Sequence, residues 1–120
     1  MNIEQLRNFC LAFPGATEDI KWSADLCFCV GKKMFAVFTG LVEERFSVVF
    51  KPEPDERPAL VTDPRFYVPK YYGPAGWLAL DFTAAPVDWD EVAELVEGSY
   101  RQVALKRMLN ALQVQRGDSH

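Results

Sequence analysis

Residues 26–38 read LCFCVGKKMFAVF, and this stretch decides the fold class. Two β-prone runs flank Gly31-Lys32, a pattern typical of a β-hairpin. A third run, RFSVVFK at residues 45–51, follows after a polar turn. Its alternation puts Val49 on one face and three residues on the other: Phe46, Val48 and Phe50. The three runs predict a meander of antiparallel strands.

Helical patterns flank this meander. Asn2 can cap a first helix, which Pro14-Gly15 ends, and its apolar stripe is formed by Ile3, Leu6, Phe9, Cys10 and Phe13. Residues 16–25 are too short and polar to decide between a helical turn and a loop.

The second half of the chain predicts a strand and a long helix. Residues 77–82 read WLALDF and predict the strand, and Asp88 with Glu91 forms a capping-box-like start to the helix. Apolar residues at helical spacing run on to Val103, and three later ones can prolong the stripe: Met108, Leu109 and Leu112. The fold class is therefore α+β, with an antiparallel sheet of about four or more strands packed against N- and C-terminal helices.

A proline-rich connection separates the meander from that strand. Residues 52–76 hold six of the eight prolines, which fragment helices and exclude central-strand pairing, so only one short helix is expected, around residues 56–61. Four aromatic residues lie close together in it: Phe66, Tyr67, Tyr71 and Tyr72. Because it is long and aromatic, this loop is the expected functional loop.

Size and charge limit the possible functions. The chain has 120 residues, 49% of them hydrophobic, so residues 1–120 are expected to form a single domain whose end, about 114–120, frays. The amino terminus predicts neither a signal peptide nor a membrane span, so we expect a cytoplasmic protein. A net charge of −4 repels phosphate at long range, and nucleic-acid binding would need a local basic patch.

The sequence offers few groups for catalysis or for metal binding. The single histidine is the last residue, His120, where flanking structure cannot hold it as a general base. The cysteines Cys10, Cys27 and Cys29 include no C-x-x-C pair, so reduced, mostly structural thiols are expected. We therefore predict no catalytic residue, no metal and no cofactor, and rank an enzyme third among the functions.

Two groups of side chains are candidates for binding. Lys32 and Lys33 at the hairpin turn, Lys51 and Lys70 can converge on phosphate, although such lysines also serve as ordinary solvated residues at strand ends. The second group can stack on bases or on a planar ligand, or fill the core instead: Trp22, Trp77, Trp89, Tyr67, Tyr71 and Tyr72.

The order of several short motifs resembles the MmcQ/YjbR-like family over nearly the whole chain. The motifs are F-P-G at 13–15, Trp22, G-K-K-M-F at 31–35, V-V-F-K at 48–51, a Pro- and Tyr-rich loop before Trp77, and Ser99-Tyr100. The resemblance implies a double-wing-like α+β domain that is commonly labelled DNA-binding. The residues that match are Lys33, Met34, Phe35, Lys51, Trp77, Ser99 and Tyr100. Of these, the resemblance leaves Lys33 and Lys51 as phosphate contacts.

The leading hypothesis is therefore a DNA-binding module. In it, lysines hold phosphate while Tyr71, Tyr72 or Trp77 supplies stacking. The alternative is a non-catalytic domain that uses the aromatic loop, residues 66–77, to bind a protein or a small planar ligand. The oligomeric state does not follow from the sequence.

Overall fold

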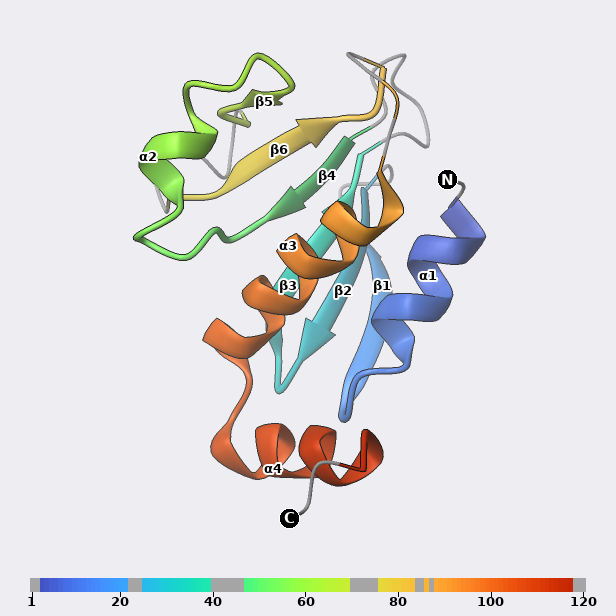
Figure 1. Ribbon diagram of the computed structural model, residues 1–120. Helices are drawn as coiled ribbons and strands as arrows, with labels where there is room; N and C mark the ends of the chain where they lie inside the picture. Colours follow the sequence, from blue (N-terminus) through green and yellow to red (C-terminus); the bar gives the residue numbers. More distant parts are fainter. Residues whose placement is uncertain are drawn as a thin grey trace.

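The fold is a six-stranded antiparallel sheet with helices on one of its faces (Figure 1). It is seen in a computed structural model that describes residues 3–21, 25–39, 47–69, 76–83, 86 and 88–117. The elements are α1 (Ile3–Leu11), β1 (Ala16–Lys21), β2 (Asp25–Val30), β3 (Lys33–Phe38), β4 (Ser47–Phe50), α2 (Arg57–Leu60), β5 (Phe66–Tyr67), β6 (Leu78–Asp81), α3 (Trp89–Val103) and α4 (Lys106–Gln115). The strand order is β1-β2-β3-β4-β6-β5, and the predicted α+β class is confirmed.

The predicted meander forms the middle of the sheet. β2 and β3 pair around a tight turn in which Gly31 and Lys32 both have positive φ, 55° and 72°. β4 then pairs with β3, so that Ala36 lies opposite Phe50. In β4, Val48 and Phe50 face the helices and Val49 faces the other way, as the alternation predicts. The local turn and strand signals were therefore sufficient here.

A β-bulge interrupts the pairing of β2 with β3. Phe28 pairs with Ala36 but Cys29 pairs with Met34, which leaves Phe35 as an extra residue in β3. The Phe35 side chain is fully buried on the helix side of the sheet. The bulge thus adds a large aromatic ring to the core.

The first six residues of the segment that the sequence left undecided, Ala16–Lys21, form a strand. After α1, the amide of Ala16 donates to the carbonyl of Phe13, and Gly15 takes a φ of 76°. The chain then forms β1, which pairs antiparallel with β2. Every residue of β1 is paired, from Ala16 opposite Val30 to Lys21 opposite Asp25. The neighbouring strand thus imposes the extended conformation on a polar sequence.

The last helical stripe does not continue past Val103. Ala104 and Leu105 are extended, with ψ angles of 147° and 156°, and a separate helix, α4, begins at Lys106. α4 crosses the lower end of the sheet in Figure 1, where Leu112 is buried. The apolar residues Met108, Leu109 and Leu112 therefore belong to another helix, although they pack against the same main core.

The main core lies between the sheet and the helices. Tyr100 of α3 stacks on Phe13 with the ring centres 4.4 Å apart, and its edge meets Phe35 at 5.3 Å. A smaller apolar cluster lies on the opposite face of the sheet and contains Cys27, Val37, Val49, Trp77 and Ala79. Among the described residues, no helix has the length and apolar character needed to cross a membrane.

Candidate functional site

The hairpin turn that carries Lys32 and Lys33 lies beside the C-terminal helix, α4. Lys32 and Lys33 are exposed at the β2–β3 turn. The end of the Met108 side chain approaches within 3.8 Å of the point where a Cβ on Gly31 would stand. Residues more than 70 positions apart in the sequence thus meet at one end of the sheet.

α4 adds two further cations to this end. Lys106 and Arg107 are exposed in its first turn, and no acidic residue accompanies them there. Residues 104–117 contain no aspartate or glutamate at all. We call Lys32, Lys33, Lys106 and Arg107 the basic end.

Lys106 and Arg107 were not among the binding residues predicted from the sequence. A signal was present, because cations in the first turn of a helix oppose the helix dipole and gain nothing from it. α4 also begins at Leu105 without a side-chain cap, so no local interaction accounts for the pair. Their meeting with the hairpin, however, depends on where α4 packs.

Lys51 reaches the same end of the sheet from another strand. It directly follows β4, and the register puts it opposite Phe35, two residues from Lys33. Its amide donates to Ser99 Oγ at 2.9 Å, and its carbonyl accepts from Gln102 Nε2 at 2.7 Å. The backbone of Lys51 is therefore fixed, while its side chain is half-buried.

The aromatic candidates are not assembled into a visible stacking surface. Lys70, Tyr71 and Tyr72 lie outside the described residues. Trp77 is 9% exposed within the small apolar cluster on the sheet face away from the helices, so little of its ring is available to a base. Its role as a contact stays a prediction, as do those of the other three residues.

Two further aromatic residues are held by packing or hydrogen bonding. The hydroxyl group of Tyr67 donates to Ser47 Oγ at 2.8 Å. The ring of Trp89 meets Phe9 edge-on at 5.3 Å. Trp22 is outside the described residues. For Tyr67 and Trp89, the contacts support a role in packing the fold and not one in stacking on a ligand.

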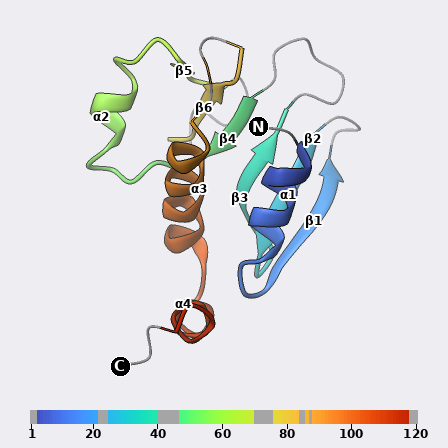
Figure 2. The same cartoon turned by 45° about the vertical axis from the view of Figure 1, so that its right-hand side comes forward.

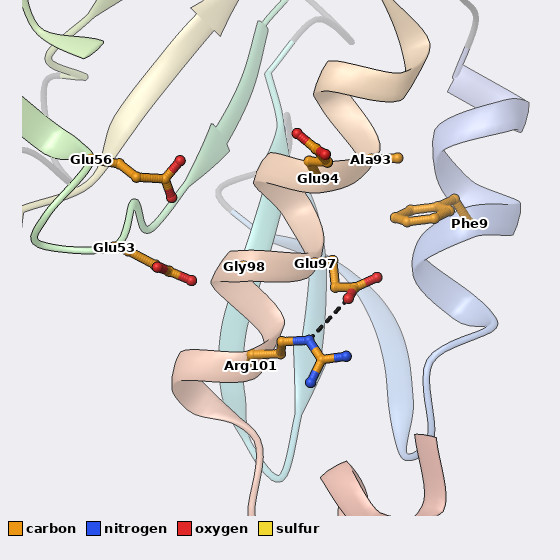
Figure 3. A pocket seen from close by; sticks show the side chains of 8 residues that line it. All are labelled: Phe9, Glu53, Glu56, Ala93, Glu94, Glu97, Gly98 and Arg101. Carbon is orange, nitrogen blue, oxygen red and sulfur yellow. Dashed lines mark hydrogen bonds and ion pairs between the residues drawn. The ribbon is translucent and has the colours of Figure 1, made fainter. Parts of the chain in front are cut away.

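One hollow in the described surface is acidic. A groove of about 410 Å³ lies around the exposed side of α3 (Figure 3). It is lined by Phe9, Glu53, Glu56, Ala93, Glu94, Glu97, Gly98 and Arg101, and we call it the acidic groove. In Figure 3, Glu53 and Glu56 approach α3 from one side and Phe9 lies on the other.

Among the described residues, Glu97 is the one carboxylate of the groove's four with a charged partner. Glu97 pairs with Arg116 at 2.6 Å and with Arg101 at 2.9 Å, and these hydrogen bonds hold its pKa below the usual range. Glu53, Glu56 and Glu94 add negative charge beside it, so the groove repels phosphate. Any contact with a polyanion must therefore be made elsewhere.

Ser99 and Tyr100 join motifs that lie far apart in the sequence. Ser99 Oγ donates to the carbonyl of Phe35 at 2.6 Å and accepts from the amide of Lys51. The Tyr100 hydroxyl group donates to the carbonyl of Pro14 at 2.7 Å. Ser99 and Tyr100 therefore hold distant segments together. This structural role explains why both residues belong to the motifs of the family resemblance although neither is part of a catalytic group.

The described residues offer little for covalent or metal chemistry. No group of three histidine, cysteine, aspartate or glutamate side chains within them could hold a metal ion. Burial raises the pKa of the Cys10 thiol far above its ordinary value, so this cysteine is not a ready nucleophile.

Comparisons with known proteins agree on a family and on a fold. A family model described as YjbR matches residues 11–102. The crystal structure of the Deinococcus radiodurans protein DR2400, with the domain DUF419, superposes with a TM-score of 0.75 at 20% identity, covering 97% of this chain and 88% of that one. A Pseudomonas syringae protein gives 0.68 at 17% identity, covering 85% and 98%. No protein with a curated description matches the chain.

Proposed function

The chain belongs to the YjbR family, and we propose that it is a non-enzymatic, cytoplasmic binding module whose basic end contacts the phosphate backbone of DNA. The observation that carries the proposal is the contact of the β2–β3 turn, which carries Lys32 and Lys33, with α4, which carries Lys106 and Arg107, through Gly31 and Met108. Cations grouped on one surface supply most of non-specific nucleic-acid affinity because they release counterions from the phosphates.

The uneven distribution of charge over the chain supports DNA binding, although the net charge is negative. The chain carries −4, but the segments 31–33 and 104–117 contain no carboxylate. The acidic groove holds four glutamates on the flank of α3, and one of them, Glu97, is paired with Arg116 at the C-terminal end of α4, the end opposite to Lys106 and Arg107. At physiological ionic strength, fields fall off over about 8 Å, so local charge outweighs net charge for a bound phosphate.

The basic end reads no sequence. Its members are lysines and one arginine on a turn and a first helical turn, and Trp77, the described stacking candidate, is nearly buried. Contacts with phosphate position a protein on DNA without discriminating bases. The proposal is therefore weak, non-specific binding.

The test is fluorescence anisotropy with a labelled 20-bp duplex between 50 and 200 mM salt. If all four cations contact phosphate, log Kd should rise with log salt at a slope of roughly 3.6. The double variant Lys32→Gln/Lys33→Gln should lower the slope by roughly 1.8. No binding at 50 mM salt, or a slope unchanged in this variant, would reject the proposal.

A charge-matched control separates local from net charge. The double variant Glu53→Gln/Glu94→Gln changes the net charge by the same amount in the opposite direction, but within the acidic groove. Its slope should equal that of the unmodified chain, because slope counts the phosphates contacted. Slope changes of equal size and opposite sign in the two variants would mean that net charge governs binding.

The alternative, in which residues 66–77 bind a protein or a planar ligand, has less support. Two of that loop's five aromatic residues, Tyr71 and Tyr72, lie outside the described part of the chain, and two others, Phe66 and Trp77, are buried. Among its described residues, Val68 is the one strongly exposed apolar residue. Binding that is insensitive to the lysine variants and to salt would favour it.

A further inference from the structure

β1 is an edge strand whose outer side has no neighbour among the described elements. It stands first in the strand order, pairs with β2 over all six residues, and contains neither proline nor glycine. Figure 2 shows it at the right-hand border of the sheet. The opposite edge, β5, is only two residues long and lies between Pro64 and Pro69. Of the two edges, β1 is therefore the one that can receive a further strand along its length.

The hydrogen bonds identify which backbone groups of β1 point outward. The amide of Ala16 donates to the carbonyl of Phe13 at 3.1 Å and not to β2. Because the backbone groups of successive strand residues alternate in direction, Glu18 and Ile20 also point away from β2. Neither has a backbone partner outside the β1–β2 pair among the described residues. Since the amide of Ala16 is occupied, Glu18 and Ile20 carry the open N–H groups of this edge.

The charges of β1 select one register for pairing with a second copy of the same strand. In a two-fold antiparallel pair of identical strands, the residue at the axis lies opposite itself. An axis at Glu18, Asp19 or Lys21 would put two like charges directly opposite each other, which destabilises a strand pair. An axis nearer the start of β1 would need the occupied amide of Ala16. Ile20 is the remaining position for the axis.

An axis at Ile20 matches charge with opposite charge. It places Asp19 of each copy opposite Lys21 of the other, and residues of opposite charge at such positions stabilise a strand pair. Lys21 already lies opposite Asp25 of β2, so the pairing sets it between two acidic residues in a row across three strands. The charges of β1 are therefore complementary to those of a second copy in this register.

The side chains on the helix face of β1 are also compatible with this axis. Ile20, opposite the core residue Leu26, is 59% exposed, and it would meet the same apolar side chain of the second copy. Glu18 accepts two hydrogen bonds from the Arg7 guanidinium, one of them at 2.7 Å, so its charge is already compensated. The pairing thus covers an exposed apolar residue without adding an uncompensated charge beside it.

We propose that the chain forms a two-fold dimer in which the outer edges of β1 pair antiparallel about Ile20, so that two six-stranded sheets become one continuous sheet. The backbone groups of Ile20 exchange hydrogen bonds across the axis, and the Asp19–Lys21 pairs fix the register. Because the edge pairs with its own copy, association closes at two chains. Ile20 lies toward the end of the sheet opposite to the β2–β3 turn, so the proposal does not rest on DNA binding.

The first test is sedimentation velocity of the full chain between about 10 and about 300 µM. The unmodified chain should pass from monomer to dimer as its concentration rises. Ile20→Pro removes an outward N–H at an edge position where proline is tolerated, and it should stay monomeric. Ile20→Ala is the control, because it keeps the N–H and should still dimerise.

Two results of this experiment would overturn the proposal. A monomeric unmodified chain over the whole range would leave the edge of β1 to a different partner or to none. A dimer that persists in Ile20→Pro, with a dispersed amide spectrum that shows it is folded, would use another surface.

Charge reversal tests the register. Asp19→Lys puts lysine opposite Lys21, and Lys21→Asp puts aspartate opposite Asp19. Each variant should raise the dimer Kd about tenfold, because the two-fold axis reverses both pairs at once. The double variant Asp19→Lys/Lys21→Asp restores opposite charges and should recover the dimer. A double variant as weak as the single ones would show that Asp19 does not face Lys21, and the proposed pairing would be wrong.

Discussion

Ser99 on α3 donates a 2.6 Å hydrogen bond to the carbonyl oxygen of Phe35, the extra residue of the bulge in β3. A bulged residue falls out of the ladder, so its carbonyl needs a partner from outside the sheet. The same hydroxyl oxygen accepts from the amide of Lys51, just past the end of β4. One buried side chain thus satisfies two backbone groups that secondary structure leaves unpaired.

Replacing Ser99 should therefore lower the free energy of unfolding by more than the loss of such a small side chain would suggest. Ser99→Ala leaves a buried carbonyl and a partly buried amide without their partner, so the free energy of unfolding should fall by about 1–3 kcal/mol. Urea denaturation measures it. Thr62→Ala is the control, since the Thr62 hydroxyl group makes a comparable 2.7 Å bond to Ala59 but is exposed. Equal losses in the two variants would show that burial does not matter here.

Tyr100 allows its ring and its hydroxyl group to be separated. Tyr100→Phe keeps the stack on Phe13 and removes the bond to Pro14, so the loss should be about 0.5–1.5 kcal/mol. Tyr100→Ala also empties the core and should cost about 3–5 kcal/mol. Thermal or urea unfolding distinguishes the two. A Phe variant as damaging as the Ala variant would make the hydrogen bond, and not the ring, the main contribution.

Cys10 should resist thiol reagents while the protein is folded. Its side chain is fully buried and burial raises its pKa, so almost no thiolate forms and the reagent has no access. In variants that keep one cysteine each, Cys10 should react much more slowly than the half-buried Cys29. In 6 M guanidinium chloride the two rates should converge. A fast native reaction at Cys10 would contradict the packing of α1.

Acid should destabilise the fold through three ion pairs. Arg7, Arg65 and Arg116 hold the pKa values of Glu18, Asp63 and Glu97 below their ordinary values through hydrogen bonds. Carboxylates with depressed folded-state pKa values contribute stability above their unfolded pKa, near 4, and lose it as the pH falls through the folded value. The free energy of unfolding should therefore decline below about pH 4.5.

The variant Glu18→Gln tests this assignment. It removes one of the three groups and should flatten the pH dependence between about pH 5 and pH 2. Glu4→Gln is the matched control, because Glu4 is an exposed carboxylate 3.7 Å from the same arginine. If both variants flatten the curve alike, the Arg7–Glu18 bond has no special part in it.

Structural features that depend on neighbouring residues in the sequence were predicted correctly, and features that depend on distant contacts were not. The hairpin at Gly31-Lys32 and the short helix near Arg57 were predicted correctly, because turn residues and proline act on their immediate neighbours. β5 was not predicted, since a two-residue strand has no pattern of its own. The continuation of α3 was wrong because Met108 to Leu112 keep helical spacing across a break at Ala104 and Leu105.

The residues of the candidate site show the same difference between local and long-range features. Lys32 and Lys33 were found from the turn that carries them, whereas Lys106 and Arg107 have no neighbour in the sequence that indicates their partner. Trp77 was proposed from its residue type, but its exposure depends on what packs around it. Contacts between residues 70 positions apart are set by the core and leave no local signal.

The sequence by itself determined the class of the fold, the hairpin, the starts of α2 and α3, and a chain without an internal histidine. Only the tertiary structure decided that Ala16–Lys21 is an edge strand, that α4 is separate, and that α4 contacts the hairpin turn through Met108 and Gly31. The physical reason is that turns and caps are satisfied by bonds to neighbours in the chain, whereas a polar strand and a surface charge cluster depend on what packs or pairs beside them.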